Sequence, residues 1–198
     1  MGGAQYNPAM TSPQQLYSVA QARALDADAI EHGTDGYTLM KRAGEAALRA
    51  LRSRWPRAAS LVVAAGGGGN GGDGYVLARF ARAAGLEVTV LAAVPPEQLT
   101  GDARSACEDF ISSGGQVTAY SAERLTNAEV IVDALLGTGL RAPVRPAQAQ
   151  IIREINECDL PVFALDVPSG LNGDSGAVMV AAVKADCTIS FVALKTGL

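Results

Sequence analysis

The feature that most constrains this chain is a run of glycines directly after a short apolar segment. Leu61–Ala65 is predicted to be a buried strand, and seven of the nine residues 66–74 are glycine. The amphipathic segment Tyr75–Ala84 follows and is predicted to be a helix. Glycine permits positive φ and lets backbone N–H groups approach a ligand closely. A loop of this kind before a helix favours an anionic ligand, usually a phosphate.

The glycine pattern alone does not identify the ligand. Several overlapping sets of these glycines satisfy G-x-G-x-x-G, and a nicotinamide-type Rossmann site also needs an acidic residue after the second strand. The second predicted strand, Glu87–Ala93, is followed by Val94, Pro95 and Pro96 and has no carboxylate there. This absence disfavours the usual dinucleotide site. A flexible surface turn is the other interpretation, although such linkers rarely join a buried strand to an amphipathic helix.

Composition indicates one globular domain. Hydrophobic residues make up 48% of the 198 residues and charged residues 18%, which is enough apolar chain for a single core. The net charge of −4 argues against a protein that binds nucleic acid through its phosphates. The three cysteines form no CxxC motif, so we expect a reduced, cytoplasmic protein. No apolar run approaches the roughly 20 residues of a membrane span, and residues 1–13 are predicted to be a disordered leader.

Helical and strand patterns alternate along the chain. Near-continuous apolar strands separated by helices are typical of a parallel sheet covered on both faces. The predicted fold is therefore α/β, a Rossmann-like three-layer α/β/α sandwich with a mostly parallel central sheet. The predicted helices are residues 18–30, 37–52, 75–84, 100–113 and 146–157, and the predicted strands are residues 61–65, 87–93, 116–120, 130–136, 162–167 and 187–192.

Polar residues follow or interrupt three of these strands. Asn70 and Asp73 follow the first, Asp133 lies late in the fourth, and Asp166 and Ser169 end the fifth. Ligands of doubly wound sheets bind beyond the carboxyl ends of the strands, where these groups would meet. A carboxylate in an apolar strand needs a hydrogen-bond partner, a cation or a proton. Each residue alone could instead be a turn former, but their convergence favours a site.

The residue types restrict the chemistry. The single histidine, His32, lies in a glycine-bounded turn and is predicted to be a surface residue. A Ser-His-Asp triad, a histidine-rich zinc site and P-loop phosphoryl transfer therefore have no support. The remaining groups are carboxylates, an amide, a hydroxyl and backbone carbonyls. These hard oxygen donors suit an alkali or alkaline-earth cation together with carboxylate acid–base catalysis.

Three blocks of this sequence resemble the YjeF N-terminal family. They are Gly-Asn-Gly-Gly-Asp-Gly (69–74), Val-Asp-Ala-Leu-Leu-Gly-Thr-Gly-Leu (132–140) and Ala-Leu-Asp-Val-Pro-Ser-Gly-Leu-Asn-Gly-Asp-Ser-Gly (164–176). The segments 16–21, 39–44 and 191–198 resemble further parts of the family in the same order. The best-understood members are NAD(P)HX epimerases, which repair hydrated NADH and NADPH. The resemblance therefore implies epimerase activity.

The resemblance also implies roles for individual residues. Asn70, Asp133 and Ser169 match the potassium ligands of the family, so K⁺ is the expected cofactor. Asp166 matches the carboxylate at the hydrated nicotinamide ring and is the expected acid–base group that converts the R epimer to S. The residues expected to contact the substrate are Gly69, Asn70, Gly71, Gly72, Asp73, Gly137, Thr138, Gly139, Leu140, Arg141, Ala142, Pro143 and Asp166.

The sequence departs from the family pattern in two places of the glycine loop. Gly67 replaces a proline and Gly69 replaces an asparagine, which loosens the loop and removes one side-chain contact to the ligand. The expected domain is 14–198, with a C-terminal truncation. The partners implied are hydrated NADH or NADPH, a homodimer, and a fused or separate ADP- or ATP-dependent dehydratase. A non-catalytic nucleotide- or protein-binding module and an unrelated dehydrogenase are the alternatives.

Overall fold

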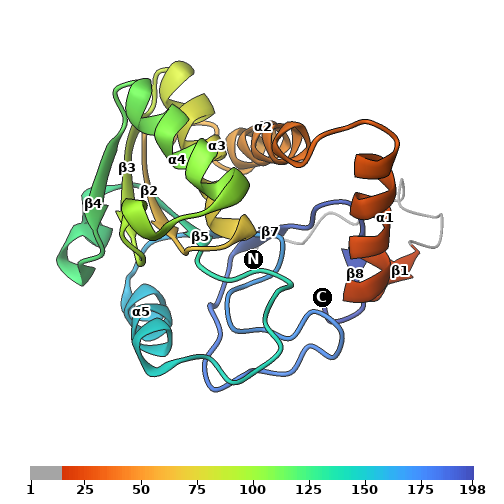
Figure 1. Ribbon diagram of the computed structural model, residues 1–198. Helices are drawn as coiled ribbons and strands as arrows, with labels where there is room; N and C mark the ends of the chain where they lie inside the picture. Colours follow the sequence, from red (N-terminus) through yellow and green to blue (C-terminus); the bar gives the residue numbers. More distant parts are fainter. Residues whose placement is uncertain (1–14) are drawn as a thin grey trace.

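The computed structural model describes residues 15–198 and is built around a six-stranded sheet (Figure 1). All five strand pairings in this sheet are parallel. The predicted α/β class is therefore confirmed. In spatial order the strands are β4 (Gln116–Ala119), β3 (Glu87–Ala92), β2 (Ser60–Ala65), β5 (Val130–Ala134), β6 (Val162–Leu165) and β7 (Cys187–Ile189).

Helices cover both faces of the sheet. α2 (Gly36–Arg54), α3 (Gly69–Ala83) and α4 (Gly101–Ser112) lie on one face, and α5 (Pro146–Glu157) lies on the other (Figure 1). Side chains of β2 alternate between two cores, because successive residues of a strand point to opposite faces. Leu61, Val63 and Ala65 pack with α2, α3 and α4, whereas Val62 and Ala64 pack with α5. The predicted three-layer arrangement is confirmed.

The glycine run does not form the loop predicted from the sequence. α3 begins at Gly69 rather than at Tyr75, and no glycine from 66 to 74 takes a positive φ. A Cβ on Gly71 would lie 2.0 Å from the carbonyl oxygen of Gly66, and one on Gly74 would lie 2.6 Å from the Cβ of Ala134. These glycines therefore let the first turns of α3 pack closely against the ends of the strands.

A second, two-stranded sheet joins the two ends of the described chain. β1 (Leu16–Tyr17) pairs in parallel with β8 (Leu194–Lys195), a pairing that the sequence analysis did not predict. Ser18 then caps α1 (Val19–Glu31) in a capping box, as its predicted helix start requires. α1 stands beside the C-terminal loops rather than on the six-stranded sheet (Figure 1), and the N–H of Val19 donates to Asp174 at 2.6 Å.

The last strand of the large sheet is shorter than predicted. β7 ends at Ile189, and residues 190–193 form a turn that leads into β8. Val192 in this turn has a φ of +63°, and the N–H of Ala193 donates to the carbonyl of Phe191 at 2.6 Å. The turn ends the pairing with β6 and redirects the chain toward β1. The structure also contains 3₁₀ helices η1 (Pro96–Gln98) and η2 (Ala122–Asn127).

Two further features of the described chain are its lack of a helix that could span a membrane and the state of its cysteines. None of the helices between residues 15 and 198 has the length and apolarity needed to cross a membrane. Cys107, Cys158 and Cys187 are free thiols. The leader predicted for residues 1–13 lies outside the described residues.

Candidate functional site

A cavity of about 1100 Å³ opens at the carboxyl ends of β2, β5 and β6. α1 and α2 form its opposite wall. Of the polar residues predicted to meet at the strand ends, Asn70, Asp73 and Asp166 line this cavity. Asp133 and Ser169 lie beneath its floor and are fully buried. The predicted convergence of strand-end side chains at one edge of the sheet is therefore present in the structure.

Asp133 and Ser169 form a buried hydrogen-bonded pair. The backbone N–H and the hydroxyl of Ser169 donate to the two carboxylate oxygens of Asp133 at 2.7 and 2.5 Å. The N–H of Leu135 donates to the same carboxylate at 3.2 Å. Burial raises the pKa of Asp133 to about 6, and these hydrogen bonds act in the opposite direction. The surroundings of Asp133 thus favour a nearby cation or a proton.

Leu136 connects this pair to Asn70. The Asn70 amide nitrogen donates to the carbonyl of Leu136 at 3.0 Å, and the N–H of Leu136 donates to the Ser169 hydroxyl at 2.8 Å. The other end of the Asn70 side chain, Oδ1, is buried and has no hydrogen-bond partner among the described residues. A buried acceptor without a partner is costly. This oxygen is therefore a suitable ligand for a cation.

The donor set around this oxygen fits an alkali cation better than a transition metal. Between residues 15 and 198 no group of three His, Cys, Asp or Glu side chains could hold a metal ion. The residues linked by hydrogen bonds here supply the amide oxygen of Asn70, the carbonyl of Leu136, the hydroxyl of Ser169 and one carboxylate, Asp133. Mostly neutral, hard oxygen ligands suit weakly charged, hard cations.

Asp166 lies at the end of β6 in a left-handed conformation, with φ of +65°. Its backbone N–H donates to the carbonyl of Ile189 at 2.8 Å. Its carboxylate accepts one hydrogen bond from the N–H of Thr138 at 3.2 Å and another from the ammonium group of Lys195. Left-handed φ is uncommon outside glycine and often marks functional sites. The strand end and two donors thus fix the direction of this side chain.

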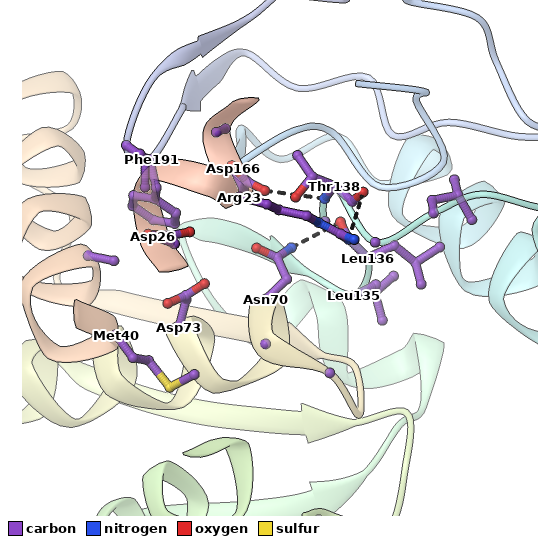
Figure 2. Close-up of a pocket in the computed structure, with 18 of the residues that line it drawn as sticks. Arg23, Asp26, Met40, Asn70, Asp73, Leu135, Leu136, Thr138, Asp166 and Phe191 are labelled. Carbon is purple, nitrogen blue, oxygen red and sulfur yellow. Dashed lines mark hydrogen bonds between the residues drawn. The ribbon is translucent and has the colours of Figure 1, made fainter. Parts of the chain in front are cut away.

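The glycine between the cation ligands and Asp166 has little free space. A Cβ on Gly137 would lie 3.1 Å from the Cβ of Asn70 and 3.2 Å from Oδ2 of Asp166. Figure 2 shows Asn70, Thr138 and Asp166 near one another, with the hydrogen bond from Thr138 to Asp166. Gly137 therefore lets the Asn70 side chain in the first turn of α3 and the Asp166 carboxylate at the end of β6 come close together.

Two more carboxyl groups face the same space as Asp166. Asp73 projects from α3 and Asp26 from α1 toward the middle of the cavity (Figure 2). Burial, followed by the negative charges of Asp166 and Asp26, raises the pKa of Asp73 well above its ordinary value. Burial also raises the pKa of Asp26, against the effect of the positive charge on Lys195. The cavity thus brings an ion-paired carboxylate near two carboxyl groups whose pKa values are raised.

The sequence analysis missed three side chains of this site. Lys195 is 2% exposed and comes from β8, Asp26 comes from α1, and Arg23 donates to the carbonyl of Thr138 at 3.3 Å. Lys195 could have been identified as a candidate from the sequence, because it is a charged residue within the apolar block 191–198. Asp26 follows the buried Ala22 by one helical turn, which places it on the inner side of α1.

Of the other predicted residues, some line the cavity and some do not. His32 is an exposed residue at the end of α1, as predicted. Gly71 and Gly72 do not line the cavity but pack against Gly66 and Met40. The predicted substrate-contacting residues that do line it are Gly69, Asn70, Asp73, Gly137, Thr138, Gly139, Leu140, Arg141, Ala142, Pro143 and Asp166.

Together, the sheet and the cavity define a doubly wound α/β domain with its site beyond the carboxyl ends of the strands. The chain belongs to the family described as YjeF-related protein N-terminus, and the match spans residues 36–197. The resemblance noted in the sequence is therefore confirmed.

Two relatives show how the chain compares with longer and shorter proteins. The bifunctional NAD(P)H-hydrate repair enzyme Nnr of Coxiella burnetii is 48% identical over 183 residues, which are 92% of this chain and 38% of that protein. The NAD(P)H-hydrate epimerase of Limosilactobacillus fermentum is 39% identical over 187 residues, which are 93% of this chain and 89% of that protein. The chain thus spans well under half of the bifunctional relative but most of the shorter one.

A solved structure supports the fold. The crystal structure of the yeast protein YNL200c superposes with a TM-score of 0.83 at 22% sequence identity, covering 92% of this chain and 82% of that chain. At this identity the similarity concerns the arrangement of helices and strands only.

Proposed function

We propose that this protein is an NAD(P)H-hydrate epimerase, which interconverts the R and S forms of hydrated NADH or NADPH. The observation that carries the proposal is the wall of the cavity, where an ion-paired carboxylate, Asp166, lies beside the buried oxygens around Asn70. A relative of which this chain covers 89% is named for the same activity. Membership in the family and the chemistry of the site thus point to one reaction.

We also propose K⁺ as the cofactor. Asn70 through its free Oδ1, Asp133 and Ser169 would hold the ion, and the carbonyl of Leu136 adds a fourth oxygen. When bound, K⁺ would supply positive charge at the wall of the cavity that carries Asn70. A cation would also compensate the buried charge of Asp133, which otherwise favours a proton.

The cavity offers two features that suit the pyrophosphate of the substrate. The first turn of α3 has no side-chain cap. The N–H groups of Gly69 and Asn70, which line the cavity, would therefore bind an anion with the help of the helix dipole. Arginine side chains also line the cavity and add positive charge for phosphate groups: Arg23, Arg42, Arg141 and Arg145. The segment Gly137–Pro143 forms the adjoining wall.

Asp166 is the proposed base at the C6 hydroxyl of the hydrated ring, and Asp73 is the proposed acid, so the acid–base role expected of Asp166 is divided between two carboxyl groups. The ion pair of Asp166 with Lys195 favours the carboxylate, and the raised pKa of Asp73 favours the acid. Asp73 therefore gives a proton to the C6 hydroxyl. The C6–O bond breaks, water leaves with the electron pair, and the lone pair of the ring nitrogen forms a C6–N double bond.

Water then adds to the opposite face of C6, and the electrons of the double bond return to nitrogen. Asp166 takes the extra proton from the new hydroxyl and passes it through solvent in the cavity to Asp73, so no proton is gained or lost. A dehydratase that consumes only the S form is the expected next enzyme, in keeping with the bifunctional relatives. A homodimer and a cytoplasmic location remain predictions from the sequence.

A coupled assay tests the proposal. Hydrated NADH prepared as a mixture of R and S is incubated with a dehydratase that acts on S alone, with and without this protein. An epimerase converts the stalled R fraction to S, so the whole mixture is consumed quickly. Unchanged consumption in the presence of folded protein and K⁺ would refute the activity and leave the non-catalytic binding module as the alternative.

A further inference from the structure

Lys195 is the most buried charged side chain of the cavity wall, and its ion pair with Asp166 is only one of its three hydrogen bonds. Its ammonium group donates to the carboxylate of Asp166, to the Ser190 hydroxyl at 3.1 Å and to the carbonyl of Phe191 at 2.6 Å. A lysine ammonium has three N–H donors. All three have acceptors within the protein, so Lys195 has no donor left for a substrate.

The surroundings of Lys195 fix it in place. The Ser190 hydroxyl donates its own proton to the carbonyl of Ala193 at 2.9 Å, so it can only accept from Lys195. The left-handed φ of Val192 closes the turn that brings Ser190 and Phe191 around the ammonium group. Lys195 itself is held by the pairing of β8 with β1.

The same geometry acts on Asp166 from two sides. Lys195 donates to Oδ1 and the N–H of Thr138 donates to Oδ2, which leaves no freedom for the carboxylate to rotate. The other charged groups near it are Asp26 and Arg23 on α1 and Asp73 on α3. Two of these three, Asp26 and Asp73, are carboxyl groups, and their negative charges would disfavour a negative charge on Asp166. The third, Arg23, is a cation but donates to the carbonyl of Thr138. Lys195 is therefore the cation that pairs with Asp166.

We propose that Lys195 is a positioning residue, which holds Asp166 as a carboxylate and points it at the reacting carbon of the substrate. This inference rests on the proposed epimerase function and assigns a role to a residue outside the strand ends. Lys195 acts only through Asp166, because its three donors are already used. Asp166 can then take a proton without first losing one.

The test compares variants of Lys195 in the coupled assay over a range of pH. K195M removes the charge, K195R keeps it with a different shape, and K184M removes an exposed lysine as the matched control. We expect kcat to fall about 100-fold in K195M, in the range of a lost acid–base group. The acidic limb of the kcat/KM profile should move to higher pH in K195M. It should stay in place in K195R and K184M.

The double variant D166N/K195M provides a second check. If Lys195 acts only through Asp166, the double variant should be no less active than D166N alone. An acidic limb of K195M at the wild-type position would overturn the proposal, and so would a large additional loss in the double variant.

A measurement on the wild-type protein covers the case in which K195M does not fold. Carbon-13 NMR of the aspartate carboxyl groups, assigned with D166N, reports directly whether Asp166 is ionised near neutral pH. An ionised Asp166 supports the proposal, and a protonated one overturns it. This measurement needs no substrate, so it tests the pair even if the wild-type protein fails to epimerise hydrated NADH.

Discussion

Adding one methyl group at Gly137 should damage the site while leaving the fold in place. The new Cβ would lie 3.1 Å from the Cβ of Asn70 and 3.2 Å from Oδ2 of Asp166, whereas ordinary contacts begin at 3.4 Å. The shortfalls are 3.4 − 3.1 = 0.3 Å and 3.4 − 3.2 = 0.2 Å. Neither neighbour can move easily, because Asn70 is hydrogen-bonded to Leu136 and Asp166 to Thr138 and Lys195.

The expected cost of G137A follows from this crowding. Overpacking typically costs about 1–3 kcal/mol, which lowers the melting temperature of a domain of this size by roughly 2–12 °C. Activity should fall more steeply. A misplacement of about 1 Å can cost about 100-fold in rate, so shifts of a few tenths of an ångström in two groups should cost about tenfold.

The measurements are thermal denaturation and the coupled epimerisation assay. G139A is the stability control, because a Cβ there would lie 3.7 Å from its nearest neighbour, Arg23. Its melting temperature should be unchanged or slightly higher, since alanine restricts the unfolded chain. If G137A matched the wild type in both melting temperature and kcat, the close approach of Asn70 and Asp166 would have no role in the reaction.

Three further predictions concern charge. D166N should lower kcat by about 100- to 10,000-fold and lower the free energy of unfolding by about 3–5 kcal/mol, because it leaves Lys195 buried without its counter-charge; wild-type thermal stability would contradict the ion pair. D73N should lower kcat at least about 100-fold and yet raise the melting temperature at neutral pH. Because the pKa of Asp73 is raised in the folded protein, its contribution to stability is fully present below its ordinary pKa of 3.8 and is lost as the pH rises through the higher pKa of the folded state. A higher melting temperature of D73N that persisted below pH 3.8 would refute this account. K⁺ should raise the melting temperature relative to Li⁺, because a K⁺ concentration of 100 times its Kd increases the free energy of unfolding by about 2.7 kcal/mol; equal melting temperatures would argue against the cation site.

The sheet was predictable from the sequence because its strands are short, apolar and buried on both faces. Val62 and Val63 point to opposite cores, and both must be apolar, so the strand pattern is nearly continuous. The start of α3 was not predictable in the same way. Glycine has a low helix propensity, and only the contacts of Gly71 and Gly74 with the strand ends explain why helix begins there.

The candidate site was predictable where it depends on the strand ends. Asp133 and Asp166 interrupt apolar strands, and the carboxyl ends of parallel strands meet at one edge. Lys195 could not be placed by this rule, because it belongs to a two-residue strand that pairs with residues near the start of the chain. Asp26 likewise comes from a helix that does not cover the six-stranded sheet. Lys195 and Asp26 could therefore be assigned to the site only from the tertiary structure.

The proposed cation site and the proposed acid–base group share one short piece of backbone. Leu136 contacts Asn70 through its carbonyl and Ser169 through its N–H, and two residues later the N–H of Thr138 donates to Asp166. A cation bound to the Asn70 and Leu136 oxygens would therefore also restrain the residue that orients the Asp166 carboxylate. Gly137 lies between these two contacts and fits closely against both neighbours. The stability gained from K⁺ and the rate of epimerisation should accordingly rise together as K⁺ is added, with the same midpoint concentration.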